Sequence, residues 1–277
     1  MRTLILIALL AFVNCGNKSE IPFSHSSSVG SGETLRSRIA PPKGYSWVDE
    51  EEGSFAEFLQ GVKLKEKGSK ILDYRNNPID NQYEHIAIMD FDVGSKDLQQ
   101  CADAVIRLRT EYLWEQQRHD DIAFHFTSGH LFKWNDYKKG LRPKVSGNKV
   151  SFLPAGPRDE SYAALRRYLD WIFMYAGTIS VFRETTPVTA DHHIEPGQII
   201  INPGSPGHTA IIAGRARNAK GHTVYLLAQG YMPAQSIHVL TNPFNNALNP
   251  WYDISTSNSQ IKTARYTFCD TNIRSYD

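Results

Sequence analysis

Cysteine is scarce in this sequence, which has only Cys15, Cys101 and Cys269. Cys15 directly follows an apolar N-terminal segment, so two cysteines remain for the body of the protein. These two permit one disulfide at most, and that bridge is an open alternative in a protein exported to an oxidising compartment. Without the bridge, Cys101 is the cysteine best placed to act as a nucleophile.

An excess of charge of either sign is also missing. The 30 basic residues are balanced by 29 acidic ones, and the two kinds are interspersed along the chain. The absence of a basic stripe argues against a nucleic-acid partner. Internal repeats and coiled-coil heptads are not apparent, and the 41% of apolar residues indicates a folded globular body.

The N-terminal apolar run is too short to span a bilayer. In residues 1–14 one arginine precedes about 10 apolar residues, whereas a membrane helix needs about 20. This pattern is typical of a bacterial export signal. The Phe-Val-Asn-Cys sequence that ends at Cys15 resembles a lipobox, although Asn14 replaces the usual small residue. The resemblance implies acylation of Cys15 and attachment to a membrane on the periplasmic or cell-surface side; the alternative is a secreted protein with a free thiol.

The remainder divides into a tether and one domain. Residues 15–40 are rich in Ser and Gly and predict a flexible, lipid-anchored tether. Residues 41–277 are long enough for one domain with elaborations. Capping residues and apolar spacing predict helices after Ser54, around Cys101 and at 161–175, and strands at 45–48, 85–91, 199–201, from 208, at 222–229 and before 240.

Cys101 lies near the start of the strongest predicted helix, for which Ser95 or Asp97 is the expected cap. The N–H groups and dipole of a helix N-terminus favour a thiolate, especially beside an imidazolium. Gln-Cys at a helix start resembles CHAP-type amidases, and this makes Gln99 and Gln100 candidates for donating a hydrogen bond to an oxyanion. Because Cys101 also belongs to the apolar stripe of the helix, a buried core cysteine is the alternative.

Residues 195–229 contain a second part of the same pattern: a Pro-Gly turn, the apolar strand 199–201, and a Gly-His pair at His208 that opens the next strand. This order resembles the NlpC/P60 and CHAP families of papain-like cysteine hydrolases. The resemblance implies that His208 is the catalytic histidine. It also implies that Gln229, on the following strand, orients the histidine ring.

The match to these families has departures. Gln198 replaces the customary Asp after the Pro-Gly turn. The segment between Cys101 and that turn is longer than in compact members, which implies an insertion. Tyr231 and His238 are alternatives to Gln229 as the orienting residue.

The resemblance implies an α+β, papain-like fold in which an antiparallel sheet packs against the helix of Cys101, with insertions. It implies hydrolysis or transfer at an amide bond of a cell-envelope peptide, such as one from peptidoglycan, and this chemistry needs no metal or organic cofactor. Two alternatives stay open: a binding lipoprotein that uses the same cleft, and a structural envelope protein. The whole mature chain also resembles an uncharacterised bacterial lipoprotein family with a domain of unknown function, which implies no activity.

Overall fold

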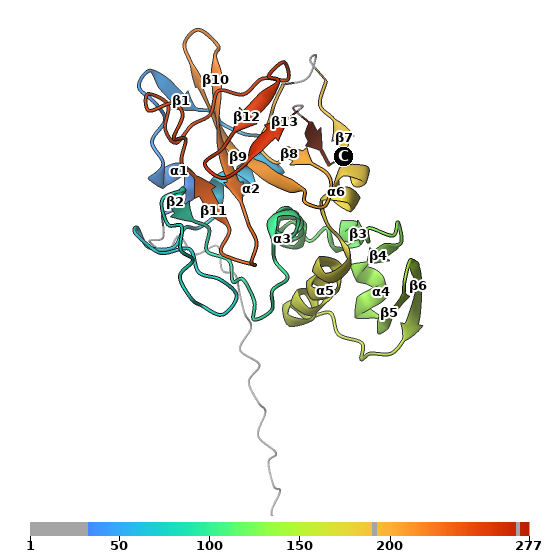
Figure 1. Ribbon diagram of the computed structural model, residues 1–277. Coiled ribbons are helices and arrows are strands. Elements are labelled where there is room, and N and C mark those ends of the chain that lie inside the picture. Colours follow the sequence, from blue (N-terminus) through green and yellow to red (C-terminus); the bar gives the residue numbers. More distant parts are fainter. Residues whose placement is uncertain (1–32, 190–192, 270–271, 277) are drawn as a thin grey trace, which may run out of the picture. The chain divides into compact units, whose positions relative to one another are not determined.

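A large antiparallel sheet organises the part of the chain that the computed structural model describes, residues 33–189, 193–269 and 272–276 (Figure 1). All its pairings are antiparallel, and the predicted α+β class is confirmed. The strand order is β2 (His85–Ile88), β11 (His238–Leu240), β10 (Thr223–Gln229), β9 (His208–Asn218), β8 (Ile199–Asn202), β14 (Ile273–Ser275) and β7 (Thr186–Pro187), with β1 (Tyr45–Trp47) paired to β9.

The other elements are hairpins and helices that flank this sheet. The hairpins pair β3 (Ala123–His125) with β4 (Leu131–Lys133), β5 (Leu141–Ser146) with β6 (Lys149–Pro154), and β12 (Gln260–Lys262) with β13 (Thr267–Cys269). The helices are α1 (Leu35–Arg38), α2 (Phe55–Gly61), α3 (Cys101–Glu115), α4 (Trp134–Lys138), α5 (Tyr162–Tyr175) and α6 (Thr178–Glu184), with a 3-10 turn at His119–Asp121.

Two helices start where the sequence predicts. The Ser54 hydroxyl accepts from the backbone N–H of Glu57 at the start of α2. The Ser161 hydroxyl accepts from the N–H of Ala164 at the start of α5. Each side chain satisfies one of the free N–H groups of the first turn, so both helices begin at the residue after the serine.

The helix of Cys101 begins later than the sequence predicts. Neither Ser95 nor Asp97 is its cap, because the first helical residue is Cys101 and the N-cap is Gln100. Asp97 instead accepts from the backbone N–H of Ala234, at 2.7 Å, and from the Gln100 side chain, at 3.1 Å. These bonds fasten the loop before α3 to the β10–β11 connection. Cys101 is therefore the first residue of the helix, at the N-terminal end where the helix dipole acts most strongly on it.

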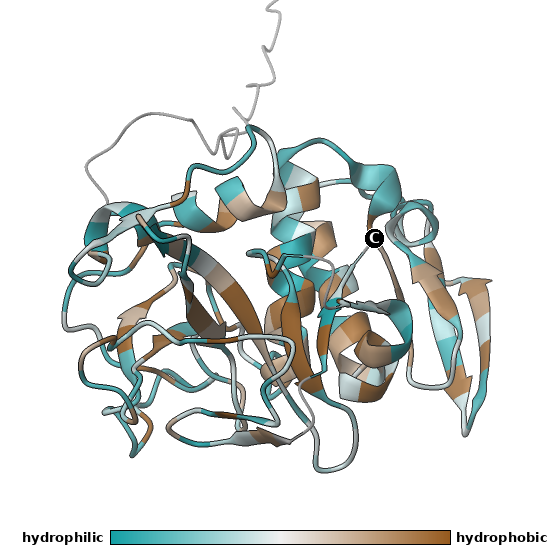
Figure 2. Cartoon of the chain, turned by 90° about the horizontal axis from the view of Figure 1, so that it is seen from above, coloured by the Kyte–Doolittle hydropathy of each residue, from teal (hydrophilic) through white to brown (hydrophobic). Residues whose placement is uncertain are grey.

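The sheet separates two apolar clusters. Ile211 of β9 packs with α3 on one face, whereas Ala210 and Ile212 pack with Phe268 of β13 on the other. This is the alternation of side chains that a strand requires. Figure 2 shows apolar residues gathered on the central strands and on the inner sides of the helices.

The folded part begins before residue 41. Residues 33–40 were predicted to belong to the tether, but Leu35 and Ile39 are buried, and the Trp47 indole donates to the Ile39 carbonyl at 2.9 Å. The prediction is therefore wrong for residues 33–40, because two apolar side chains in this short segment find places in the core. The predicted export signal and the lipidated Cys15 lie outside the described residues.

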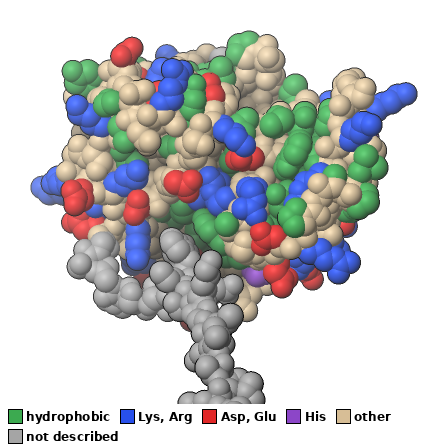
Figure 3. All heavy atoms as spheres, turned by 90° about the horizontal axis from the view of Figure 1, so that it is seen from below, with side chains coloured by type: hydrophobic (Ala, Val, Ile, Leu, Met, Phe, Trp, Pro, Cys, Tyr) green, Lys and Arg blue, Asp and Glu red, His purple; other side chains and the backbone are tan. Residues whose placement is uncertain are grey.

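The segment between α3 and β8 consists of hairpins and helices, which lie beside α3 in Figure 1. Its two hairpins pack with α4 and α5: Phe132 stacks on Phe152 at 4.9 Å, and the Tyr168 hydroxyl donates to the Phe132 carbonyl. The described residues contain no helix that is both long and apolar enough to cross a membrane. On the face shown in Figure 3, basic and acidic side chains are interspersed.

Candidate functional site

Cys101 is held at the first position of α3. The backbone N–H of Gln100 donates to the Asp103 carboxylate at 3.0 Å, which fixes the first turn. Cys101 is buried, with 8% of its surface exposed, and it is a free thiol. The alternative of a disulfide between Cys101 and Cys269 is therefore not realised.

The start of α3 packs where β9 and β10 diverge. At this end the last paired residues of the two strands are Ile211 and Ala228, while β9 continues to His208 beside β8. Gly230 follows β10 and lies against α3: a Cβ there would be 2.7 Å from the Gln100 carbonyl oxygen. This close approach requires glycine, and it brings the start of α3 to the sheet.

His208 opens β9 after the Gly-Ser-Pro-Gly loop, and only 3% of it is exposed. Gly207, the residue before it, lies against the Thr178 hydroxyl and the Asn202 carbonyl, and a Cβ there would collide with both. Asn202 is also the partner of His208 in the β8–β9 ladder. The loop and the ladder together fix the position from which the His208 ring extends.

His208 and Gln229 form a buried hydrogen bond, with 2.8 Å between His208 Nε2 and Gln229 Oε1. Gln229 Nε2 in turn lies 3.3 Å from Nε2 of His238, whose Nδ1 is 2.9 Å from the Ser236 carbonyl oxygen. The structure thus brings together the histidine and glutamine that the sequence paired. His238 lies behind Gln229 and does not replace it.

An aromatic cover, formed by Tyr231, Tyr266 and Phe268, encloses the His208 ring. The three ring centroids lie 5.0, 4.7 and 5.6 Å from that of His208. Tyr231, an alternative orienting residue in the sequence, contributes its ring to the cover. The cover therefore explains why the imidazole is buried at the end of a strand.

Arg265 ties this cover to the edge of the sheet. Its guanidinium lies 4.1 Å from the centre of the Tyr231 ring and 3.3 Å from the Glu84 carboxylate. Burial raises the pKa of Glu84, and Arg265 opposes that rise. Glu84 precedes β2, so one arginine connects the β12–β13 hairpin, the β10–β11 connection and the edge strand.

Burial keeps both candidate catalytic groups neutral at pH 7. It lowers the pKa of His208 to about 4, an effect that the hydrogen bond to the Gln229 oxygen opposes and the positive charge of Arg265 assists. Burial, and then the Asp103 carboxylate, raises the pKa of the Cys101 thiol to about 11. The resting site therefore holds a thiol and a neutral imidazole, and not the ion pair of a thiolate and an imidazolium.

Cys101 and His208 both lie at the start of β9. The backbone N–H of Thr209, the residue after His208, opposes the rise in the Cys101 pKa, so the thiol lies beside this strand end. Along β9, however, Ile211 packs with the α3 cluster, while the His208 ring stacks near Phe268 on the other face. Within the described chain, no hydrogen bond joins the Cys101 thiol to the His208 ring.

Gln99 and Gln100 are not placed as oxyanion donors. The Gln99 amide accepts from Arg107 at 3.1 Å and donates to the Asp92 carbonyl at 3.4 Å. The Gln100 amide donates to Asp97. Because both amides hold the loop before α3, that prediction is not supported. The backbone N–H groups of the first turn of α3 have no partners within the helix and are the better donors.

Arg107 joins the loop before Cys101 to helix α5. Its buried guanidinium donates to Glu111 one turn along α3, to the Asp92 carboxylate at 3.0 Å, and to the Tyr162 hydroxyl of α5 at 3.2 Å. Arg166 of α5 also reaches Asp92, at 3.0 Å. A charge buried this deeply requires these partners, since an unpaired guanidinium would be strongly destabilising.

Residues 35–275 match a family model described as Domain of unknown function (4846). The chain belongs to this family. Neither the comparison with curated proteins nor the comparison with solved structures gives a match. The family domain contains Cys101, His208 and Gln229, and it confirms the predicted likeness to an uncharacterised domain.

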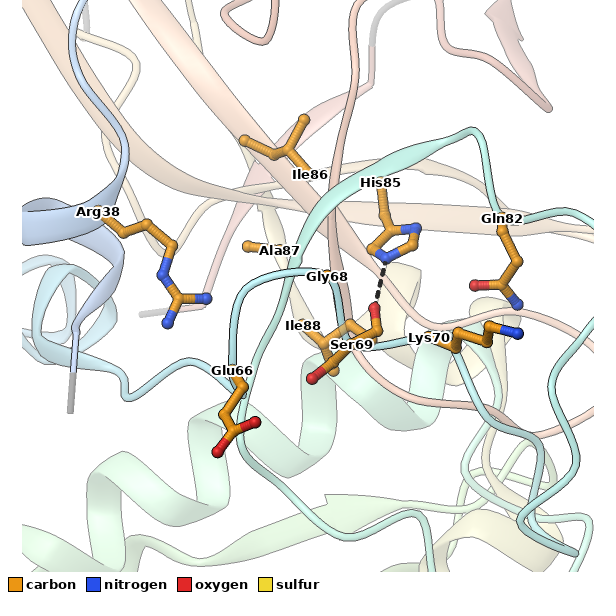
Figure 4. Close-up of a pocket in the computed structure, with 10 residues that line it drawn as sticks. All are labelled: Arg38, Glu66, Gly68, Ser69, Lys70, Gln82, His85, Ile86, Ala87 and Ile88. Carbon is orange, nitrogen blue, oxygen red and sulfur yellow. Dashed lines mark hydrogen bonds between the residues drawn. The ribbon is translucent and has the colours of Figure 1, made fainter.

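The family domain also contains a pocket of about 330 Å³ at the edge strand β2 (Figure 4). Arg38, Lys70 and His85 are among its lining residues, and His85 Nε2 lies 3.0 Å from the Ser69 carbonyl oxygen. None of the three candidate catalytic residues lines this pocket. One of its lining residues, His85, has its ring centroid 6.3 Å from that of His238.

Sequence reasoning missed the aromatic cover and its arginine. Tyr266 and Phe268 are two residues apart, which is the spacing of side chains on one face of a strand, and Arg265 precedes them. This signal was available, but it did not indicate which surface the strand covers.

Proposed function

We propose that this chain is an exported cysteine hydrolase that acts at an amide bond, with Cys101 as nucleophile, His208 as base and then acid, and Gln229 as the orienting residue. One observation carries the proposal. The buried hydrogen bond of 2.8 Å between His208 and Gln229 lies at the strand end against which the helix starting with Cys101 packs. A thiol, an imidazole and a group that orients the ring are what such hydrolases combine.

The proposed fold is papain-like. Three features support it: a cysteine that begins a helix, an antiparallel sheet packed against that helix, and a later strand that opens with a histidine. The same features carry the resemblance to the NlpC/P60 and CHAP families. In this reading, the hairpins and helices between α3 and β8 are the insertion that lengthens the chain.

In the proposed reaction, the His208 ring accepts the thiol proton while the Cys101 sulfur attacks the carbonyl carbon of the amide. Backbone N–H groups at the start of α3 stabilise the oxyanion. The C–N bond then breaks and the amine leaves with the proton from His208. Water, deprotonated by the same ring, hydrolyses the thioester and restores the thiol.

This reaction needs the site to open first. The thiol and the ring are both buried and neutral, so substrate must displace part of the aromatic cover and bring the two groups into reach of one another. Catalysis then starts by general-base removal of the thiol proton. It does not start from a preformed ion pair.

The proposed substrate is a cell-envelope peptide, such as one from peptidoglycan, and the proposed location is the surface of a bacterial membrane. Both follow from the export-like residues 1–14, the lipobox-like sequence at Cys15 and the family resemblance. A lipid anchor at Cys15 would hold the folded body close to such a substrate.

A second candidate is a binding lipoprotein on the same fold with no functional nucleophile. The raised pKa of Cys101, together with the missing hydrogen bond to His208, favours it. The two functions differ in one measurable property, the reactivity of the thiol in the native protein.

The test is labelling of the purified protein at pH 7 with a peptide aldehyde or vinyl sulfone, which mimics an amide substrate, followed by mass spectrometry. A hydrolase is expected to be labelled at Cys101, and His208→Ala should slow labelling at least tenfold. His222→Ala is the matched control, because His222 is exposed and bonds Tyr45 and Asp253 away from the site.

Labelling that occurs only after unfolding, or at the same rate in His208→Ala and in the parent protein, would contradict the hydrolase and support the binding lipoprotein. Circular dichroism of each variant shows whether a slower reaction reflects loss of the fold.

A further inference from the structure

We infer that His238 is a positioning residue that fixes the proton of the His208 ring on Nε2 and leaves Nδ1 as the basic nitrogen. The inference concerns the bonds among buried groups, and only its catalytic meaning rests on the proposed function. It follows from a chain of three hydrogen bonds that runs from Ser236 through His238 and Gln229 to His208.

The series of hydrogen bonds begins at the Ser236 carbonyl oxygen, a group that can only accept. The Ser236 carbonyl oxygen can accept a hydrogen bond but cannot donate one. His238 Nδ1, at 2.9 Å from it, must therefore carry a proton. Burial lowers the pKa of His238 to about 4, so the ring is neutral at pH 7 and its Nε2 presents a lone pair.

The lone pair of His238 then determines how Gln229 is turned. Its amide nitrogen lies 3.3 Å from His238 Nε2 and can donate to it. The reversed amide would place a carbonyl oxygen against that lone pair and would leave both groups without a donor in the core. Gln229 must therefore direct its oxygen toward His208.

The Gln229 oxygen sets the tautomer of His208. At 2.8 Å from Nε2 it can only accept, so Nε2 carries the proton and Nδ1 is bare. A bare Nδ1 is what a general base requires in order to take a thiol proton. Without His238, the Gln229 amide could reverse and present its NH₂ group, which would favour a proton on Nδ1 and remove the base.

The experiment is nitrogen-15 NMR of protein labelled at histidine, at pH 7, with the His208 signals assigned from their loss in His208→Ala. The parent protein should show the Nε2-protonated tautomer at His208. His238→Leu removes the acceptor, and it should shift His208 to the other tautomer or to a mixture. His238→Gln places an amide oxygen near the position of Nε2, and it should restore the parent spectrum.

His85→Ala is the control, because His85 packs against His238 but takes no part in the three hydrogen bonds. The His208 signals of the His85→Ala protein should equal those of the parent protein. An Nδ1-protonated His208 in the parent protein overturns the inference, even if the leucine variant does not fold. An unchanged tautomer in a folded His238→Leu protein also overturns it.

The NMR result does not depend on whether Cys101 reacts. Expected tautomers with an inert thiol would reject the proposed function and keep the inference. With a reactive thiol, His238→Leu should label at least tenfold more slowly than His238→Gln.

Discussion

Gly230 and Gln100 touch through their backbones: a Cβ on Gly230 would lie 2.7 Å from the Gln100 carbonyl oxygen and 3.0 Å from the Ala104 side chain. The end of β10, which carries Gln229, and the residue before Cys101 are thus held together by main-chain packing. A change at this contact should affect both the fold and the site.

Gly230→Ala is expected to push the start of α3 away from the sheet. Overpacking of this kind costs about 1–3 kcal/mol, which urea unfolding can measure. Labelling of Cys101 should change as well, since its position relative to His208 changes. Gly61→Ala is the control, because a Cβ there meets nothing within 4 Å. Equal stability of the two variants would show that the Gly230 contact is looser than described.

Gln229→Leu should destabilise the protein by about 1–3 kcal/mol, because it leaves the buried His208 and His238 nitrogens without a partner. The free energy of unfolding, measured by chemical denaturation at pH 7, checks this. Gln260→Ala, on the exposed surface of β12, should change it by no more than about 0.5 kcal/mol. If Gln229→Leu leaves the free energy of unfolding unchanged, water or another group must form hydrogen bonds with both histidine rings in the variant.

The stability that His208 and His238 contribute should fall on acidification from pH 6.5 to about 4. His208 and His238 each have a pKa of about 4 in the fold, against 6.5 for an unperturbed histidine. Between these values the unfolded chain binds more protons, so unfolding is favoured as the pH falls, by up to about 3 kcal/mol for each histidine. Unfolding free energies across this range test the sign. His238→Gln should have a shallower slope, and an identical slope would contradict the prediction.

Asp103→Asn should make the Cys101 thiol more acidic. The Asp103 carboxylate is the second cause of the raised thiol pKa, after burial, and asparagine keeps an oxygen that can accept from the Gln100 N–H. As the pH is raised from 7 to 10, the rate of iodoacetamide labelling should begin to rise at a lower pH in the variant than in the parent protein. If the two rate profiles coincide, the carboxyl is uncharged in the native protein and does not act on the sulfur.

The strands of the central sheet could be predicted because their signals are local. Apolar residues alternate along a strand with a period of two. The pairing of His208 with Gln229 was implied by the family resemblance, and the hydrogen bond between them agrees with it. The start of α3 could not be predicted, since Asp97 has the features of a cap but is drawn to the Ala234 N–H, far away in sequence. The aromatic cover was missed because Tyr266 and Phe268 contact His208, which is also far away in the sequence.

The segment between α3 and β8 is tied to the candidate site through the buried Arg107. The bonds of Arg107 to Asp92 and to Tyr162 of α5 join the loop before Cys101 to this segment. In hydrogen exchange, the amides of this loop and of α5 should therefore open together as one cooperative unit.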